Sequence, residues 1–455
     1  MKQFGRTMLT VMGLVVAAAV LSSIPAQAQF LFVDCSGLTP PPAFPSISSA
    51  LFALQTSVPP SVPPTVGPGA FIGVTGQCNE NVFISGALNL FLAAFGPVAL
   101  NGNLSINNSE NVSVFGLNVT NNFGDGIDIN SSRSVVLGSC TSNGNAGNGL
   151  FAGQSSDVVV NATGAFSNNG DRGLVIGNNS FVNIVAFAGT VDISNNQGAA
   201  LSVGQANFAT IGNTHIANNG HTPNGNISAA IDMRGGGKVQ MGSFFGPNVI
   251  ENNPNGAVSL QENAEISFFS ILPNGQNTIR NNGPFGIEAG FGSQVTLVGA
   301  QITGHSGPGV DIYAHSQLYG TSQIPGLGAT QIQNNGTAGD RLSAGIRVDG
   351  NSETLLRGVT ISQNNGPAIL ALTNSSVDFA GNTFNGNAGV ITCDSTSSMV
   401  SDLANAARTP AAGVICATAH TLGNRVVSVP APAVPDISVW KKLHKNYLQR
   451  LAARK

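Results

Sequence analysis

Charged side chains are scarce in this chain of 455 residues. Only 9% of the residues are Asp, Glu, Lys or Arg, against about 25% in an average soluble domain. Residues 29–435 carry 20 acidic side chains and 10 basic ones, so the body of the chain is acidic. Because contacts from Lys and Arg to phosphate supply most of the affinity for nucleic acid, this balance excludes a nucleic-acid binder that works through a basic face.

Tryptophan and tyrosine are also rare, with one Trp and three Tyr beside 24 Phe. Sugar-binding grooves usually stack rings on Trp or Tyr, so this shortage counts against a dedicated glycan enzyme. We expect the phenylalanines to stack inside the fold. The six histidines lack metal spacing, and the chain has no C-x-x-C, H-E-x-x-H, G-x-S-x-G or P-loop, which excludes the familiar zinc and nucleophile motifs.

The first 28 residues have the organisation of a secretory signal. Lys2 and Arg6 precede an apolar stretch, and Ala26-Gln27-Ala28 forms an A-x-A cleavage site. The alternative is an uncleaved membrane anchor, which Pro25 disfavours because a spanning helix needs about 20 continuous residues. We therefore expect an exported protein that is periplasmic, extracellular or at the cell surface.

Cysteine is infrequent, and in an exported chain it is expected to form disulfides. We predict that Cys35 pairs with Cys78 and that Cys393 pairs with Cys416, which leaves Cys140 over. The alternative is that all five remain buried thiols.

What the sequence does contain is an internal repeat marked by asparagine. Most intervals between successive markers are about 21 to 34 residues. The markers are Asn121-Asn122, Asn143-Gly144-Asn145, Asn168-Asn169, Asn195-Asn196, Asn218-Asn219, Asn252-Asn253, Asn281-Asn282, Asn334-Asn335, Asn364-Asn365 and Asn385-Gly386-Asn387.

Three short stretches of alternating apolar and polar residues follow each marker, which predicts three strands per repeat. No helical pattern separates the strands, although parallel strands within one sheet normally need a helical crossover. Stacked coils remove the need for helical crossovers, because each strand then pairs with its copy in the next coil at about 4.8 Å. Asparagine suits the corners, since it tolerates a left-handed backbone and its amides can form ladders. The sequence thus predicts an all-β solenoid.

On these features the chain resembles the right-handed parallel β-helices of the pectin-lyase-like superfamily, over about residues 70–392. Its opening segment, Gly76-Gln77-Cys78-Asn79-Glu80-Asn81-Val82, is similar to the G-T-Y-x-E-x-V opening of such proteins, with Cys78 at the aromatic position. The resemblance implies a fold of about a dozen coils. It also implies relatives that act on polysaccharides, among them lyases that use Ca²⁺.

The open ends of a solenoid must be capped against edge pairing. At the start we predict a short capping helix within residues 44–54, with Ser46 as N-cap, followed by a Pro-rich linker that completes a segment 29–69. At the other end, residues 393–435 would form a cap and a proline spacer.

Residues 436–455 form a basic tail with an apolar stripe, which predicts an amphipathic helix. We favour a tail that docks on the acidic solenoid as an end cap. The alternative is a helix that contacts an anionic membrane or a partner.

Stacking converts the alignment of coils into geometry. In the strand after each asparagine corner, the central residue points outward. This outward column is Asp128, Phe151, Val175, Ser202, Asp232, Ser259, Glu288, Asp311, Arg347 and Leu370. The column two residues further on is Asn130, Gly153, Gly177, Gly204, Arg234, Gln261, Gly290, Tyr313, Asp349 and Leu372.

The coils between residues 230 and 350 therefore carry a polar patch. Glu288 and Asp311 would lie about 5 Å apart on adjacent coils, with Arg347 one coil further. Such a carboxylate pair could serve a retaining glycosidase or hold Ca²⁺, with Arg347 neutralising a uronate. The alternative is a surface ladder in which Arg347 offsets Asp311. A candidate binding patch around these three comprises Asp232, Arg234, Gln261, Tyr313 and Asp349.

One further segment, Gly124-Asp125-Gly126-Ile127-Asp128, is similar to the N-T-D-G-I-D signature of polygalacturonases, in which Asp125 would match the catalytic acid. The family's D-D pair, G-H-G and R-I-K are absent, and Gly304-His305-Ser306 is the nearest string to G-H-G. This departure argues against polygalacturonase activity.

Together these features predict an exported, monomeric β-helix scaffold or surface protein. We expect it to be non-catalytic and to bind a glycan or a protein along its faces. The alternative is a Ca²⁺-assisted polysaccharide lyase or glycoside hydrolase that uses Glu288, Asp311 and Arg347.

Overall fold

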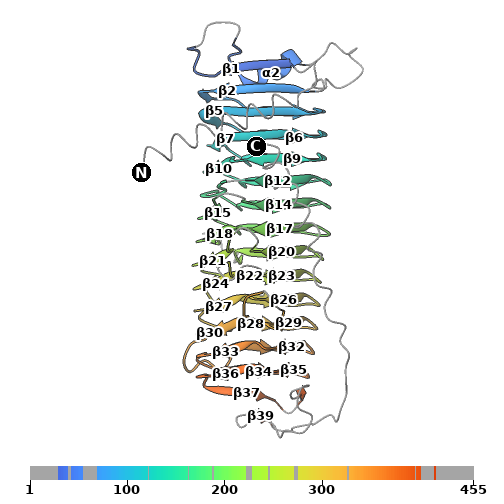
Figure 1. Cartoon of the computed structure of the whole chain (residues 1–455), viewed down its shortest axis with the longest axis vertical. Coiled ribbons are helices and arrows are strands. Elements are labelled where there is room, and N and C mark those ends of the chain that lie inside the picture. The colour runs from blue at the N-terminus through green and yellow to red at the C-terminus, as the bar shows by residue number, and fades with distance from the viewer. Residues whose placement is uncertain are drawn as a thin grey trace.

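The computed structural model describes residues 29–38, 43–54, 69–120, 122–161, 163–186, 189–221, 228–243, 246–270, 275–324, 327–394, 396–400 and 414–416. The predicted signal and the basic tail lie outside these residues. The described chain forms a rod of stacked coils, with β1 and α2 at one end and β39 at the other (Figure 1). All strand pairs are parallel, and each coil follows the one before it along the rod.

Three parallel sheets form the described rod, and the third of them begins only at residue 191. The first sheet has 14 strands: β4 Val82–Ser85, β6 Leu104–Asn107, β8 Ile127–Asn130, β11 Leu150–Gly153, β13 Leu174–Ile176, β16 Leu201–Val203, β19 Ile231–Met233, β22 Val258–Leu260, β25 Ile287–Ala289, β28 Val310–Ile312, β31 Ile346–Val348, β34 Pro367–Ala371, β37 Gly389–Cys393 and β39 Val414–Cys416.

The second sheet has 17 strands: β1 Gln29–Asp34, β2 Ala70–Thr75, β3 Gln77–Cys78, β5 Leu90–Asn101, β7 Ser113–Thr120, β9 Val135–Gly138, β10 Thr141–Asn143, β12 Asp157–Asn161, β14 Phe181–Val185, β17 Phe208–Gly212, β20 Lys238–Gly242, β23 Glu265–Phe269, β26 Gln294–Val298, β29 Gln317–Thr321, β32 Glu353–Arg357, β35 Ser376–Ala380 and β38 Ser398–Val400. The third has eight: β15 Val191–Ser194, β18 Thr214–Ala217, β21 Val249–Glu251, β24 Thr278–Arg280, β27 Gln301–Thr303, β30 Gln331–Gln333, β33 Thr360–Ser362 and β36 Thr383–Asn385.

The register of the first sheet is the one that the repeat alignment predicts. Glu288 pairs with Asp311 and Asp311 pairs with Arg347, while Ile287 and Ala289 point inward and are fully buried. This alternation arises because successive side chains of a strand point to opposite faces. The predicted all-β, right-handed parallel β-helix is therefore confirmed.

The corner between the third sheet and the first carries an asparagine ladder. The first asparagine of a pair adopts a left-handed backbone, as at Asn195 (φ 58°) and Asn252 (φ 56°). The second is buried, and its amide bonds the next copy: Asn196 Nδ2 donates to Asn219 Oδ1 at 2.9 Å, and Asn253 donates likewise to Asn282 at 2.8 Å. The ladder confirms the role predicted for asparagine.

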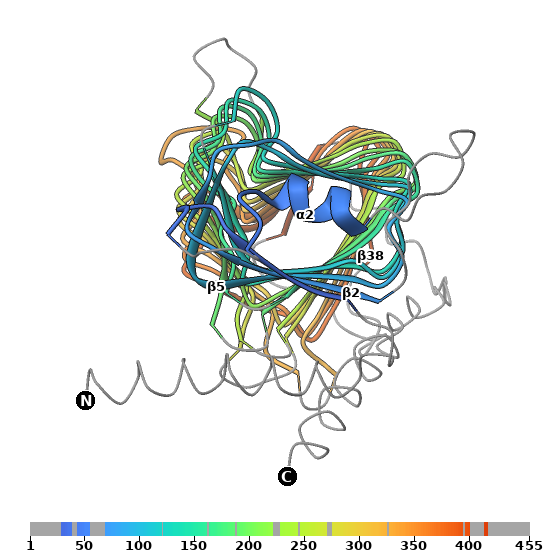
Figure 2. The ribbon, with the colours of Figure 1, turned by 90° about the horizontal axis from the view of Figure 1, so that it is seen from above.

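The first coil is closed by helix α2, Ile47–Leu54, which lies across the opening of the rod when it is viewed from above (Figure 2). Ile47, Leu51 and Leu54 are buried, as predicted. Ser46 caps the helix, since its Oγ accepts the N–H of Ser49 at 3.0 Å. The capping helix and its N-cap are confirmed.

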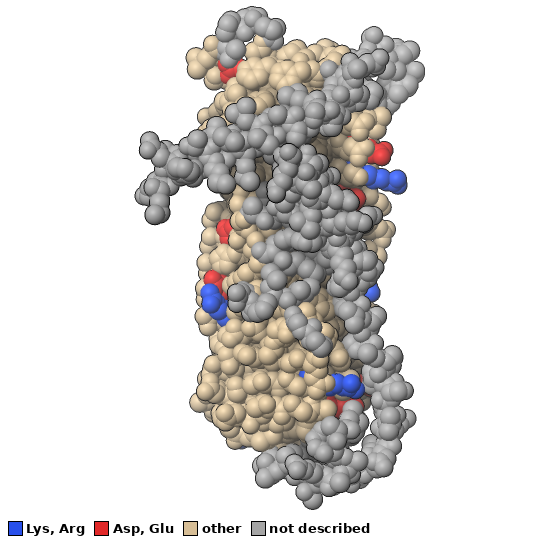
Figure 3. All heavy atoms as spheres, viewed as in Figure 1, with Lys and Arg blue, Asp and Glu red and all other residues tan. Residues whose placement is uncertain are grey.

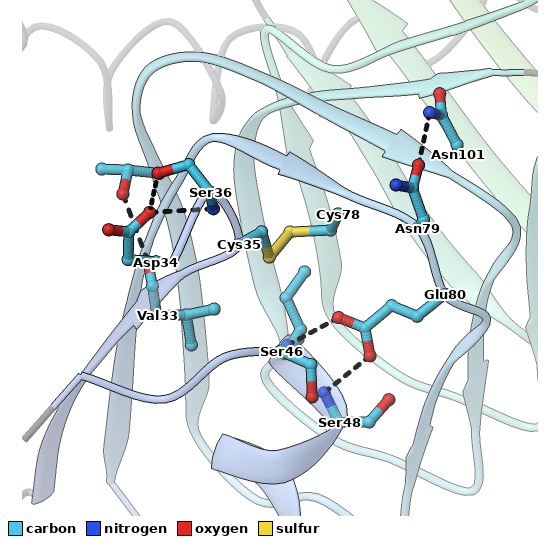
Figure 4. Close-up of a disulfide and its surroundings, with 12 residues drawn as sticks. Val33, Asp34, Cys35, Ser36, Ser46, Ser48, Cys78, Asn79, Glu80 and Asn101 are labelled. Atoms are coloured by element: carbon cyan, nitrogen blue, oxygen red, sulfur yellow. Dashed lines mark hydrogen bonds between the residues drawn. A yellow bond between two sulfur atoms is a disulfide. The ribbon is translucent and has the colours of Figure 1, made fainter. Parts of the chain in front are cut away.

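A second, unpredicted cap comes from the opening motif. The carboxylate of Glu80 accepts the N–H of Ile47 at 2.7 Å and that of Ser48 at 3.0 Å (Figure 4). A carboxylate at this position satisfies free backbone donors and opposes the positive end of the helix dipole. The disulfide between Cys35 and Cys78 lies beside it and joins the segment after β1 to β3.

The other cysteines agree with the sequence in part. Cys140 is a free, buried thiol, and burial raises its pKa to about 12. Cys393 is disulfide-bonded, and its backbone pairs in register with that of Cys416. The Cys393–Cys416 bridge itself remains a prediction.

The expectation that phenylalanine stacks inside the rod is wrong for the first coils. Phe30, Phe71, Phe91 and Phe115 stack on the outer face of the second sheet, with neighbouring ring centroids 5.0 to 5.1 Å apart. The reason is register, because each alternates with an inward aliphatic residue such as Ile72, which is fully buried.

In the described part of the chain, no helix has the length and apolar character needed to cross a membrane.

Candidate functional site

The predicted polar patch lies on the first sheet, on strands β19, β22, β25, β28 and β31 and the turns that follow them. On the face seen in Figure 3, blue and red groups are isolated on a surface that is mostly tan. A second group of ionisable side chains lies on the third sheet, where ion pairs link Asp192, His215, Glu251 and Arg280.

Its centre is an ion pair between Asp311 and Arg347, whose Oδ1 and Nε atoms are 2.9 Å apart. The Asp311 side chain is only 10% exposed and that of Arg347 20%. Burial raises the pKa of Asp311 to about 6, although the charge of Arg347 acts to lower it. Because both side chains are largely buried, this pair differs from the weak, solvent-exposed ladder that the sequence allowed as the alternative.

Glu288 lies on the adjacent strand, one pairing step from Asp311. Burial raises the pKa of its carboxyl, against the opposing effects of the Ser259 hydroxyl and the charge of Arg347. Ser259 Oγ donates to Glu288 Oε2 at 3.4 Å. The two carboxylates are thus brought together as predicted, and the charge of Glu288 adds to the raised pKa of Asp311.

An aromatic pair flanks the carboxylates. The Tyr313 ring lies over Gly290, where an added Cβ would come within 2.5 Å of the ring. Its hydroxyl accepts a hydrogen bond from Gln261 Nε2 at 2.8 Å, two coils away. Phe291 meets Tyr313 edge to face, with ring centroids 5.9 Å apart.

Phe291 is the site residue that the sequence reasoning missed. Its side chain is 58% exposed, and its backbone is left-handed at φ 53°. This conformation is unfavourable for a bulky residue. Other coils place Asn178, Glu262 or Ala314 at such positive-φ turn positions. The sequence alignment of the coils could have identified Phe291, because it is a Phe at a turn position where the other coils carry small or polar residues.

Three other predicted members of the patch lie around this centre. Arg234 Nε is 3.5 Å from Asp232 Oδ1, and Arg234 is exposed. Asp349 follows β31, and its charge contributes to the raised pKa of Asp311. The structure therefore gathers the eight predicted residues on one face of the first sheet.

The residues do not suit a calcium ion. Calcium takes six to eight oxygen ligands, whereas Glu288 and Asp311 offer two carboxylates, and the guanidinium of Arg347 already pairs with Asp311. The one cluster of three potential metal ligands in the described residues is Cys35, Cys78 and Glu80, and its sulfurs are joined in the disulfide. The geometry of the patch therefore does not support a Ca²⁺-assisted reaction at Glu288 and Asp311.

The polygalacturonase-like segment lies elsewhere. Asp125 Oδ1 accepts the backbone N–H of Asn148 at 2.7 Å and its side-chain amide at 2.9 Å, so this carboxylate ties two coils together. The neighbouring strand β8 is six pairing steps from β25, or roughly 29 Å along the rod.

His305, in the string nearest to G-H-G, is 2% exposed at the asparagine corner. Burial lowers its pKa to about 4, which is typical of a neutral, structural imidazole.

Comparison with known proteins agrees with this fold. Residues 277–419 match the family model of the right handed beta helix region. The A-module of the mannuronan C-5 epimerase AlgE6 of Azotobacter vinelandii is 14% identical, with a TM-score of 0.37, over 78% of this chain and 94% of that one. The family 28 exopolygalacturonase of Yersinia enterocolitica is 12% identical, with a TM-score of 0.28, over 82% and 79%. No curated protein matches the chain.

The stacked coils and the match to that family model show a right-handed parallel β-helix, which is the fold that the repeat predicted. Likenesses at this identity and TM-score carry no argument about the site or the activity of this chain.

Proposed function

We propose that the protein is an exported β-helix scaffold that binds a glycan on its first sheet, through the patch on β19 to β31, without altering it. The observation that carries the proposal is the exposed ring of Phe291, held edge-on to Tyr313 beside hydrogen-bonding side chains. Ring faces next to polar groups are the chemistry that an amphipathic sugar needs. The disulfide supports export, since such bonds persist in oxidising compartments.

Pairing within the patch favours binding over catalysis. The Asp311 carboxylate already has a guanidinium beside it, Tyr313 holds Gln261, and Glu288 has a hydroxyl partner. Mutually paired groups form a rigid surface. The patch spans successive coils that lie about 4.8 Å apart along the rod, which suits an extended polymer.

A test is to present purified chain to a set of immobilised polysaccharides of different charge and linkage. Binding of at least one is expected, and Phe291→Ala should weaken it about tenfold by removing the ring platform. Phe83→Ala is the matched control, because Phe83 is 63% exposed on the same sheet but on strand β4. Equal loss in both variants, or no binding at all, would contradict the proposal.

A glycoside hydrolase is the second candidate, favoured by the pKa of about 6 for Asp311 beside Glu288. Asp311 would protonate the leaving oxygen, and Glu288 would act as nucleophile or base. To detect hydrolysis, the same polysaccharides are incubated with the protein in solution, and new reducing ends are measured. If the wild-type protein releases reducing ends and Glu288→Gln does not, the hydrolase hypothesis replaces the scaffold hypothesis.

A further inference from the structure

The charges of the patch do not balance, and the excess is negative. Four carboxylates, those of Asp232, Glu288, Asp311 and Asp349, stand against the two guanidinium groups of Arg234 and Arg347. Arg347 pairs with Asp311, and Arg234 with Asp232.

Two carboxylates remain for a ligand. Among the described residues, no ion pair within 4.0 Å involves Glu288 or Asp349. Both side chains are partly exposed. They lie on the same two columns as Asp311 and Tyr313, so they face the same bound chain.

The aromatic pair lies among these carboxylates. The charges of Glu288 and Asp311 both act on the Tyr313 hydroxyl, which shows how close the ring is to them. The Phe291 ring is exposed beside it. An aromatic face attracts a cation within about 6 Å of its centre, and neighbouring carboxylates strengthen that attraction.

A uronate chain would meet like charge on this surface. The wider molecule adds to the repulsion, because residues 29–435 carry 20 acidic side chains against 10 basic ones. A neutral sugar would leave Glu288 and Asp349 without a charged partner. A protonated amine would satisfy both the carboxylates and the rings.

On the basis of the proposed function, we propose that the glycan bound by this patch carries protonated amino groups, as in a polymer of glucosamine. The sugar faces lie against Phe291 and Tyr313, and the ammonium groups reach Glu288 and Asp349. The ion pair of Asp311 and Arg347 lies between Glu288 and Asp349, beneath the bound sugar.

The test uses calorimetry on the purified chain with three hexasaccharides: glucosamine, its fully N-acetylated counterpart, and galacturonate. The glucosamine hexamer should bind at least about tenfold more tightly than the N-acetylated one, and galacturonate should not bind measurably. Raising the salt concentration should weaken only the glucosamine complex, because screening acts on charge.

A charge-removing variant locates the amine contacts. Glu288→Gln/Asp349→Asn should lower the affinity for the glucosamine hexamer about tenfold and leave that for the N-acetylated hexamer nearly unchanged. Glu265→Gln/Glu353→Gln removes the same charge from strands β23 and β32 of the second sheet and should change neither. Circular dichroism confirms that both variants fold.

The outcomes separate the two proposals. Equal binding of the glucosamine and N-acetylated hexamers, or tight binding of galacturonate, overturns the amine inference and leaves the glycan scaffold standing. Equal weakening by both double substitutions also overturns it, since the amines would then be held by the general acidity of the rod. If none of the three hexamers and no polysaccharide of the wider set binds, the proposed function fails as well.

Discussion

Each buried corner asparagine holds three coils together. Asn253 Oδ1 accepts both the backbone N–H and the amide of Asn219, at 2.8 and 3.2 Å. Its own backbone N–H and amide donate to Asn282 Oδ1 at 3.1 and 2.8 Å. The side chain is fully buried, so water cannot replace any of these hydrogen bonds if the side chain is removed.

Asn253→Ala should therefore destabilise the protein strongly, by about 2–4 kcal/mol, because it leaves several buried donors unpaired. Asn252→Gly is the control. Asn252 is exposed with a left-handed backbone, which glycine adopts freely, so its effect should stay within about 0.5 kcal/mol. Urea unfolding followed by circular dichroism measures both. Similar effects in the two variants would show that the ladder contributes little.

The Asp311–Arg347 pair gives a prediction in both stability and pH. Arg347→Met should cost about 2–3 kcal/mol, less than a fully buried pair because Arg347 keeps 20% exposure. Adding Asp311→Asn should recover most of this loss, since it removes the uncompensated charge. Urea unfolding at pH 7 of the two single variants and the double variant measures the coupling. If the loss of stability in the double variant equals the sum of the losses in the two single variants, the two residues do not stabilise the fold as a pair.

The pH dependence follows from the raised pKa of Asp311. The folded state holds this proton with a pKa of about 6, above the ordinary value of 3.8. This carboxyl therefore costs stability above pH 6, and the cost disappears as the pH falls toward 4. Arg347→Met should enlarge the effect by raising the pKa further. The carboxyl signal of Asp311, followed by NMR titration in both proteins, reports the shift, and a lower midpoint in the variant would refute it.

At the scale of elements, the capping helix α2 has eight residues, too few to be stable alone. Its stability comes from burial of Ile47, Leu51 and Leu54 on the first coil and from two caps, Ser46 and Glu80. The opening motif is therefore a structural device that connects the first coil to its lid.

Glu80→Gln keeps the shape of the side chain but removes its charge, so α2 should lose about 1 kcal/mol of local stability. Amide hydrogen exchange of residues 47–54 should quicken about fivefold, while the later coils are unchanged. Asp171→Asn, at an exposed corner far along the chain, serves as the control. Unchanged exchange in α2, or equally faster exchange along the whole rod, would show that Glu80 is not a cap.

At the scale of the whole molecule, the rod is a one-dimensional stack in which each coil contacts mainly its neighbours. Stability is then close to a sum of coil contributions, and the ends need the most protection. The disulfide Cys35–Cys78 and helix α2 close one end. A long, stiff surface with one concentrated polar patch is what an extended ligand would require.

The sequence predicted the fold in detail because stacking makes the repeat alignment equivalent to the register. The pairing of Glu288, Asp311 and Arg347 on consecutive coils followed directly from the spacing of the asparagine corners. The Cys35–Cys78 bridge was predicted on another basis, namely that each cysteine near an end of an exported chain pairs with its near neighbour.

The sequence alone also determined the acidity of the body and the asparagine ladder, since both depend on composition and local backbone preference. Only the tertiary structure decided which side chains are buried together. It revealed the outward stack of Phe71, the exposure of Phe291 and the burial of Asp311. Burial and ring orientation depend on neighbours two coils away, such as Gln261 on Tyr313, and no local pattern in one coil encodes them.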